Sequence, residues 1–355
     1  EGDVMPAYYG ETANSCRLEE CLLKASDMIG WKEKGMRTVM PDGKIRARGV
    51  AMAMQGSSIS NCDVGSVTVK LSDEGTYHIT VGCTDMGTGC DTIIAQFAAD
   101  VLETPIDNIS VYGVDTDISP YDSGSYASST TYLTGMAAVK ACEQLRERII
   151  ALAAVRMNKD ASALTFDGEN VIDESDGAKM SLFDIATASM CNNEISLEVT
   201  YSHSSPVSPP PFMAACAEIE ADPETGAIEL LDYTACVDCG TVVNTNLARV
   251  QTEGGLLQGI GMTLYEDIWY DERGKNLSNS FMQYKVPSRL DTDRIRVEFD
   301  SSYEPTGPFG AKSIGEIVIN TPAPAIADAV YNATGVWINE LPITPEKILK
   351  GMKVI

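Results

Sequence analysis

Hydrophobic and polar positions repeat along the chain with the periods expected of strands and helices. Two stretches alternate apolar and polar residues on both sides of an acidic turn that contains glycine, which predicts two β-hairpins. The first hairpin covers 64–72 and 76–83, and the second covers 214–222 and 226–236. Further strands are expected at 46–56, 107–114, 263–270 and 294–300.

Apolar residues three and four positions apart predict several helices. One begins at Thr321-Pro322, where proline suits the first helical turn, and closes at Gly335. A shorter helix begins in the same way at Thr344-Pro345. The remaining helices are expected at 16–29, 91–102, 133–157 and 247–262, with a short one after Ser181 inside an insertion at 158–195.

The order of these elements predicts two lobes. Segments 64–102 and 214–262 both read strand, turn, strand, glycine-containing loop and helix. This indicates a degenerate internal duplication, although many α/β chains contain two such units. The proline-rich segment 206–211 is the best internal boundary. We predict an α+β or α/β fold of mixed sheets flanked by helices, with an N-terminal arm and helix, a first lobe and a second lobe at 1–45, 46–205 and 206–355.

The charge balance narrows the partners. The 355 residues include 26 Lys and Arg against 51 Asp and Glu, a net charge of −25. This argues against nucleic acid and anionic membranes, because both need a basic face. No apolar run approaches the roughly 20 residues of a membrane helix, and no secretory leader or initiator Met stands at Glu1. We expect a cytoplasmic chain with reduced cysteines that is truncated, processed or cut from a longer one.

Two classes of site have weak support. The C-x-x-C at Cys236 and Cys239 could be half of a zinc site or a redox pair, but without a second C-x-x-C or a close pair of histidines a structural strand end is the better interpretation. The two histidines, His78 and His203, stand apart from each other and from any G-x-S-x-G motif. A Ser-His-Asp hydrolase is therefore poorly supported.

Three other segments are candidates for chemistry, each with a plainer alternative. Gly87-Thr88-Gly89 opens a helix, so its N–H groups could hold an anion, or it is an ordinary turn. The hydroxyl-rich segment 122–131 precedes a helix and suits a phosphate or a polyoxygenated cofactor, or it is a solvated linker. Glu316 precedes an apolar Ile-Val-Ile run, which suits a general base kept from water, or it faces solvent at a strand end.

These loops occur in an order that resembles the molybdenum hydroxylases, the family of the xanthine dehydrogenases, aldehyde oxidoreductases and nicotinate dehydrogenases. The likeness runs from about residue 16 onward and matches the C-terminal half of the molybdopterin-binding subunit. The stretches that carry it are G-C-T-D-M-G-T-G at 82–89 with Thr92, the loop 123–131 with L-T-G at 133–135, V-D-C-G at 237–240, Q-T-E-G-G at 251–255, Q-G-I-G at 258–261, Y-K-V-P at 284–287, K-S-I-G-E at 312–316, and 325–345.

The resemblance implies a role for particular residues. Glu316 would be the catalytic base, which takes a proton during hydroxylation of an electron-poor carbon with water as the oxygen source. The residues implied in cofactor binding are Gly87, Thr88, Gly89, Thr92, Tyr126, Ala127, Ser128 and Gln258. The metal would be held by the pterin's dithiolene, so no protein residue is expected as a molybdenum ligand.

The implied cofactor is Mo-molybdopterin, with a cytosine dinucleotide as one candidate form. The family's upstream G-G-x-F-G-G loop, its iron–sulfur cysteine motifs and its flavin segment are not found in this sequence. The implied partners are therefore the N-terminal half of the molybdopterin subunit, iron–sulfur (Fe–S) and flavin (FAD) subunits, and a small-molecule substrate. The isolated chain is expected to be inactive.

Two departures from the family bear on the substrate and the cofactor. Thr88 stands where the family commonly has Gln, so one amide contact to the pterin is expected to be missing. Around Gly56 the chain reads Gln-Gly-Ser-Ser, where purine-oxidising members have an aromatic residue, and this argues against xanthine. The activity implied is hydroxylation of a purine- or nicotinate-like N-heterocycle or an aldehyde. The alternatives are a non-catalytic pterin-binding scaffold and an unrelated acidic binding protein.

Overall fold

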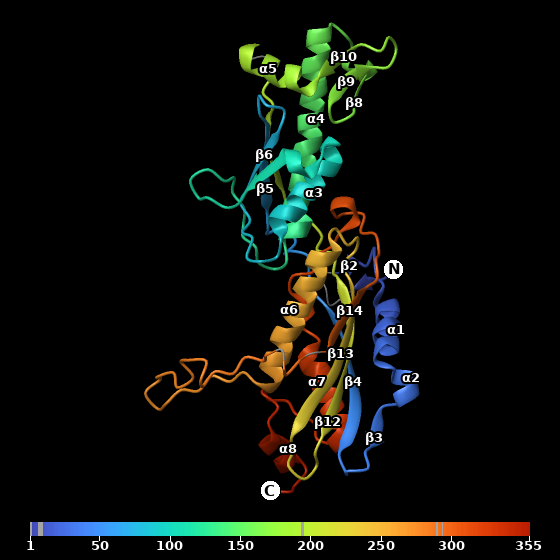
Figure 1. The fold of residues 1–355 in the computed structure, drawn as a ribbon, viewed down its shortest axis with the longest axis vertical. Coiled ribbons are helices and arrows are strands. Elements are labelled where there is room, and N and C mark those ends of the chain that lie inside the picture. The colour runs from blue at the N-terminus through green and yellow to red at the C-terminus, as the bar shows by residue number, and fades with distance from the viewer. Residues whose placement is uncertain (1, 6–9, 193–194, 289, 293) are drawn as a thin grey trace.

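The computed structural model describes residues 2–5, 10–192, 195–288, 290–292 and 294–355. It shows two lobes stacked along the long axis of the molecule (Figure 1). Each lobe contains a sheet with helices packed on it, and the chain passes between the lobes more than once. No helix in the described part of the chain is long and apolar enough to cross a membrane.

The first lobe is built on a four-stranded sheet in the order β11-β5-β6-β7. All neighbours are antiparallel except β6 and β7, which are parallel. Its main elements are β5 (Gly65–Leu71), β6 (Tyr77–Val81), α3 (Cys90–Leu102), β7 (Ile109–Tyr112), a π-helical turn (Thr130–Thr134), α4 (Gly135–Met157) and β11 (Glu198–His203). Strand β5 alternates inward and outward side chains, and its Val67, Val69 and Leu71 join the core under α3 and α4.

The insertion at 158–195 contains more structure than the sequence indicated. Besides helix α5 (Leu182–Asn192) it forms a small antiparallel sheet, whose strands are β8 (Leu164–Phe166), β9 (Asn170–Asp173) and β10 (Lys179–Ser181). Phe166 and Val171 continue the first lobe's core toward α4. The insertion is therefore an extension of that lobe.

The second lobe is built on a five-stranded sheet in the order β14-β13-β12-β4-β3. Its strands are β3 (Arg37–Val39), β4 (Ile45–Met54), β12 (Phe212–Ala221), β13 (Ile228–Asp238) and β14 (Ile295–Phe299). Its helices are α1 (Leu18–Ile29), α2 (Trp31–Lys34), α6 (Thr245–Leu264), α7 (Pro322–Thr334) and α8 (Pro345–Gly351), and a short ribbon of β1 (Val4–Met5) and β2 (Glu11–Thr12) lies near the N-terminus.

Strand β12 is buried on both faces because helices cover both sides of the sheet. Ala214 and Cys216 pack under α1, together with Cys21 and Ala25. The alternate residues of the strand, Met213, Ala215, Ala217 and Ile219, join the larger core under α6 and α7. A strand enclosed on both sides has no solvent face, which explains its nearly continuous apolar sequence.

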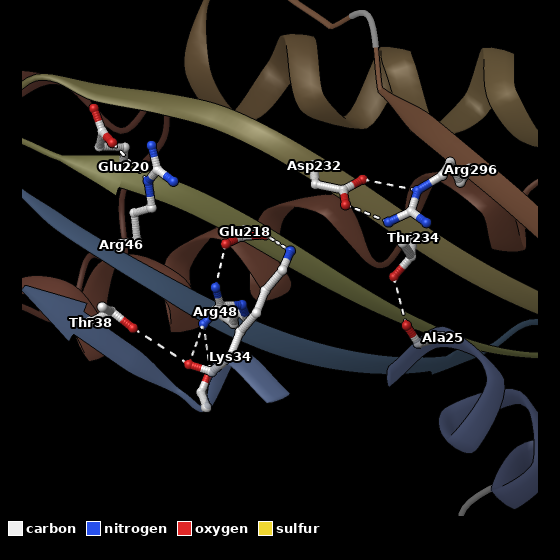
Figure 2. A network of polar contacts seen from close by, with 11 residues as sticks. Ala25, Lys34, Thr38, Arg46, Arg48, Glu218, Glu220, Asp232, Thr234 and Arg296 are labelled. Carbon is white, nitrogen blue, oxygen red and sulfur yellow. Dashed lines mark hydrogen bonds and ion pairs between the residues drawn. The ribbon is translucent and has the colours of Figure 1, made fainter. Parts of the chain in front are cut away.

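Beyond the end of α1, the same face of the sheet carries charged pairs (Figure 2). Arg48 lies directly opposite Glu218 on the paired strands, and both side chains are buried and ion-paired. Arg46 lies opposite Glu220, with Nε 2.9 Å from the carboxylate. Cross-strand pairs of opposite charge stabilise the sheet in this region.

The two halves of the chain exchange their first strands. The first half runs β4-β5-β6-α3-β7-α4 and the second runs β11-β12-β13-α6-β14-α7, each with an antiparallel hairpin, a crossover helix and a parallel strand. However, β4 pairs with β12, and β11 pairs with β5. The duplicated order seen in the sequence is thus a duplicated topology. The boundary proposed at 46–205 differs from this arrangement, because backbone hydrogen bonds place β4 in the sheet of the other lobe.

Most predicted elements have a counterpart in the structure, with ends shifted by a few residues. The strand predicted at 263–270 is wrong, because α6 continues to Leu264 and the chain then leaves the sheet. Strands β3 and β11 were not predicted. Strand β3 has three residues. Strand β11 has a largely polar sequence, because only some of its side chains reach the core.

Replacement of Gly49 by valine is expected to destabilise the protein strongly. A Cβ atom at this position would lie 2.2 Å from the backbone of both Ala325 and Ala329, so α7 would have to move away from β4. We expect the free energy of unfolding to fall by at least about 3 kcal/mol in urea titrations. The control is Gly254→Ala, where the helix surface is open and alanine favours the helix. Equal stability of the two variants would contradict the close packing of α7 on β4.

Candidate functional site

Four loops meet between the lobes and enclose a cavity of about 260 Å³. Two follow the equivalent strands β6 and β13, and two follow the equivalent strands β7 and β14. Most of the side chains that line the cavity are hydroxyl-bearing, amide or small apolar groups. They include Thr88, Ser125, Ser128, Thr130, Thr131, Thr241, Asn244, Leu247, Gln251, Ser313 and Glu316.

The two linkers that carry the exchanged strands cross beside this cavity. The Asn61 N–H donates to the Ser205 carbonyl at 2.9 Å, and the Ser208 hydroxyl donates to the Ser58 carbonyl at 2.6 Å. The Ser57 N–H donates to the Ser208 hydroxyl at 3.1 Å. These bonds fasten the two halves of the chain to each other at the point where the site is formed.

Three residues without glycine's freedom adopt left-handed backbone conformations at the site. Ser58, Ala127 and Ser128 have φ angles of 94°, 50° and 56°. The Ser58 N–H donates to the Ala127 carbonyl at 2.9 Å, so two of these residues are hydrogen-bonded to each other. Such conformations cost of order 1–3 kcal/mol each and concentrate at functional sites.

Glu316 lies on the cavity wall and is held by residues from three segments. Its Oε2 atom accepts hydrogen bonds from the Ser128 hydroxyl at 2.9 Å and from the Gln55 amide at 3.3 Å. The Ser128 hydroxyl also accepts a hydrogen bond from the Glu316 N–H at 3.0 Å. The Asn320 side-chain amide donates to the side-chain oxygen Oε1 of Gln55 at 3.4 Å. The carboxylate is therefore oriented from both lobes.

The surroundings of Glu316 differ from the enclosed position expected of it. Ile317 and Val318 point into the core of the second lobe, in a single 3₁₀ turn, while the Glu316 side chain is exposed. The apolar run therefore anchors the backbone behind the carboxylate. It does not cover the carboxylate itself.

A buried ion pair supports the cavity from behind. Lys312 and Asp238 are both fully buried, with Nζ 3.0 Å from Oδ2. The Asp238 carboxylate also accepts from the N–H groups of Arg17 and Gly240 and from the Ser302 hydroxyl, at 3.0, 3.0 and 2.7 Å. No local pattern in the sequence predicts this pair, because the two residues stand 74 positions apart.

The turn at Gly87-Thr88-Gly89 does not present free N–H groups to an anion, as the sequence had suggested it could. The Asp85 carboxylate accepts hydrogen bonds from the N–H groups of Gly87 and Gly89, at 2.9 and 3.0 Å. Those donors are therefore already used, and the adjacent negative charge disfavours an anion. Thr88 does line the cavity, and Gly89 packs so closely on Leu247 that a Cβ atom would lie 2.6 Å from its side chain.

The structure brings only some of the predicted cofactor residues to the cavity. Thr88, Ser128 and Glu316 line it. Thr92 is exposed on α3, and Gln258 is exposed on α6 two turns beyond the cavity.

Two more predicted residues shape the loop around Ser128 without lining the cavity. The Tyr126 hydroxyl donates to Asp63 at 2.6 Å. Ala127 contributes its carbonyl to the Ser58 N–H. Their part is thus in the conformation of the loop.

Gln251 lines the cavity and was not singled out from the sequence. Its side-chain amide donates to the Gly315 carbonyl at 3.0 Å, next to Glu316. It stands seven residues before Gln258 on the same helix, and each glutamine begins a Q-x-x-G pattern. The sequence therefore offers both glutamines as candidates for the site. The choice between the two glutamines depends on which one reaches the cavity, and only the packing of α6 decides this.

The thiols at the site are poor metal ligands. Burial raises the pKa of Cys239, on the cavity wall, to about 12, so the thiol remains protonated. Among the described residues, the one group of three potential ligands within 4.8 Å is Asp85, Cys90 and Asp91. Asp85 already accepts two N–H groups there.

Removal of one partner from the buried pair is expected to be costly. Asp238→Asn or Lys312→Met leaves an uncompensated charge in the interior and should lower the free energy of unfolding by about 3–5 kcal/mol. The double variant should lose less than the sum of the two losses, by about 2 kcal/mol, because neither charge remains. Urea titration of the four proteins measures this coupling, and strictly additive losses would contradict it.

Comparisons with known proteins identify the family of this chain. The profile of the molybdopterin cofactor-binding domain matches residues 24–293. A probable hypoxanthine oxidase of Escherichia coli K12 is 38% identical over 346 residues, which are 97% of this chain and 36% of that protein. The gamma subunit of a 6-hydroxypseudooxynicotine dehydrogenase complex from Paenarthrobacter nicotinovorans is 31% identical over 92% of this chain and 42% of its own length.

Solved structures show the same fold. Quinoline 2-oxidoreductase from Pseudomonas putida 86 superposes with a TM-score of 0.87 at 25% identity, over 99% of this chain and 48% of that one. A Cu,Mo-CO dehydrogenase superposes with a TM-score of 0.85 at 24% identity, over 97% of this chain and 46% of that one. The chain spans less than half the length of each of these proteins. It belongs to the family of molybdopterin cofactor-binding domains that form part of the molybdenum-binding subunits of molybdenum hydroxylases.

Proposed function

We propose that the chain is the C-terminal part of the catalytic subunit of a molybdenum hydroxylase, which hydroxylates an N-heterocycle or an aldehyde with water as the oxygen source. The observation that carries the proposal is the Glu316 carboxylate, oriented by Ser128 and Gln55 on the wall of the cavity between the lobes. The relatives named for hypoxanthine and for 6-hydroxypseudooxynicotine support an N-heterocyclic substrate class.

The residues around the cavity fit a pterin cofactor. Thr130 and Thr131, on the π-helical turn before α4, supply hydroxyl groups, as does Thr241 from the second lobe. Gln251 supplies a side-chain amide that can donate and accept. A cofactor that brings its own sulfur ligands needs such groups more than it needs histidine or thiolate, which fits the protonated Cys239.

When bound, a molybdenum cofactor supplies the two-electron oxidation that hydroxylation requires. The contribution of this chain is to position a base. The two described hydrogen bonds to the Glu316 side chain both end on Oε2, so Oε1 is the atom available to take a proton. Ser128 and Gln55 fix the orientation of the carboxylate on the cavity wall. General bases of this kind contribute about 100- to 10,000-fold to a rate.

The proposed assembly includes more than this chain. We propose as partners the N-terminal half of the molybdenum-binding subunit and subunits with iron–sulfur clusters and FAD, and a cytosine dinucleotide as one candidate form of the cofactor. The chain covers between 34% and 48% of the lengths of the proteins it matches, which supports a missing half. On this proposal the isolated chain has no hydroxylase activity, and turnover of an N-heterocycle or aldehyde by the chain alone would contradict it.

Glu316→Gln tests the role of the base. In the molybdenum-loaded assembly we expect kcat to fall by about 100- to 10,000-fold, because glutamine cannot accept the proton. Molybdenum content, measured by elemental analysis of the purified assembly, should remain unchanged, because glutamine keeps the shape and the hydrogen bonds of the side chain. Unchanged turnover would favour the non-catalytic scaffold.

A pair of glutamine variants tests the cofactor site. Gln251→Ala is expected to lower the pterin and molybdenum content of the assembly several-fold, since it removes an amide from the cavity wall. Gln258→Ala is expected to leave the content unchanged, since that side chain lies outside the cavity lining. Fluorescence of the released pterin measures both. The opposite result would restore the assignment of Gln258 made from the sequence.

A further inference from the structure

A long arm, residues 265–288, leaves the second lobe at the C-terminal end of α6 and projects from the body (Figure 1). Its large apolar side chains are exposed, and Phe281 and Met282 expose 84% and 80% of their surface. The other members of this set are Ile268, Trp269, Tyr270, Leu277 and Val286. Exposed aromatic and aliphatic groups gathered in one segment mark a surface that another molecule covers.

The arm is held in shape by its own hydrogen bonds. The Leu277 N–H donates to the Trp269 carbonyl at 2.7 Å, and the Asp271 N–H donates to the Lys275 carbonyl at 3.0 Å. At its base, the Tyr284 hydroxyl donates to the Glu266 carboxylate. A partner would therefore meet a preformed ribbon, which lowers the entropy lost on binding.

The outer face of α6 continues this apolar surface from the arm toward the cavity. Val250, Gly254, Gln258 and Met262 lie on that face at spacings of four residues, and Gln258 is its polar member. Val250 and Met262 are 63% and 48% exposed, and the space beside Gly254 is open. Gln251, the next residue after Val250, lines the cavity. One surface thus runs from the tip of the arm to the rim of the site.

We propose that the arm and the outer face of α6 bind the part of the molybdenum-binding subunit that this chain does not span. The proposal rests on the proposed function. The exposed aromatic and methionine side chains of this surface are residue types that are enriched at the centre of protein interfaces. A partner seated on α6 would also reach the rim of the cavity and close it, which no described segment of this chain does.

Charge argues against a second copy of the chain as the occupant. Each copy carries a net charge of −25, so two copies brought together along this surface would repel each other. The relatives supply a different occupant, the part of their chains that this chain does not match. Its length in the relatives, more than half of each protein, is ample for a large interface.

The test is co-expression of the tagged chain with the polypeptide that supplies the rest of its molybdenum-binding subunit. The arm variant is Phe281→Glu with Met282→Glu. The matched control is Phe183→Glu with Met190→Glu, which changes the same two residue types at exposed positions on α5. Light scattering after size-exclusion chromatography should give a 1:1 complex for the unchanged chain and the control, and at least a tenfold lower yield of complex for the arm variant.

Hydrogen exchange gives a second readout. The amides of 266–284 should exchange more slowly in the complex than in the free chain, and circular dichroism should show the arm variant as folded as the control. The proposal is overturned if the arm variant assembles normally, if no complex forms, or if the free chain is a dimer that the arm variant makes monomeric.

The failure of this inference can be told from the failure of the proposed function. Normal assembly of the arm variant with full molybdenum content removes the docking surface and leaves the proposed function intact. A complex that depends on the arm but contains no pterin or molybdenum keeps the docking surface and removes the proposed function.

Discussion

The structure depends on one buried ion pair, between Lys312 and Asp238. Two charges are removed from water completely, which costs several kcal/mol per ion unless every remaining donor and acceptor is satisfied. The Asp238 carboxylate meets that condition with hydrogen bonds from two other segments and from its own loop at Gly240. Lys312 adds the Ser15 carbonyl at 3.3 Å and the ring of Phe212 at 5.2 Å. The loop that carries Glu316 is therefore fixed to the end of β13 by an interaction that cannot be shifted without exposing a bare charge.

The strand exchange determines where that fixed loop lies. Because β4 and β11 each pair with the other half of the chain, neither lobe can complete its sheet without both halves. The linkers that connect the exchanged strands must cross, and they cross beside the cavity, where Asn61 and Ser205 are hydrogen-bonded. Equivalent loops of the two halves then face each other. The contact of Ser128 with Glu316 joins the loop after β7 to the loop after β14.

Much of the fold could be predicted from the sequence because local forces decide it. The period of apolar residues predicted both hairpins and the long helices, and Thr321-Pro322 with Gly335 marked the ends of α7. Pairing between distant strands has no such local signal. The apolar sequence of β4 would suit either sheet. Its place in the second lobe is marked by Gly49, which lets α7 pack closely against it. The segment after Leu264 looked like a strand because it is apolar, but its apolar residues face outward on the arm.

The sequence by itself determined the family, the order of the elements and the loops in which the functional residues lie, because glycine, proline and hydroxyl residues constrain the backbone locally. Only the tertiary structure decided which side chains of those loops meet. It placed Gln251 on the cavity wall and Gln258 outside the cavity lining, used the N–H groups of Gly87 and Gly89 for Asp85, and left Glu316 exposed above a buried anchor. The reason is physical. The backbone conformation of a loop depends on near neighbours, whereas the direction of a side chain depends on the packing of segments far apart in the sequence.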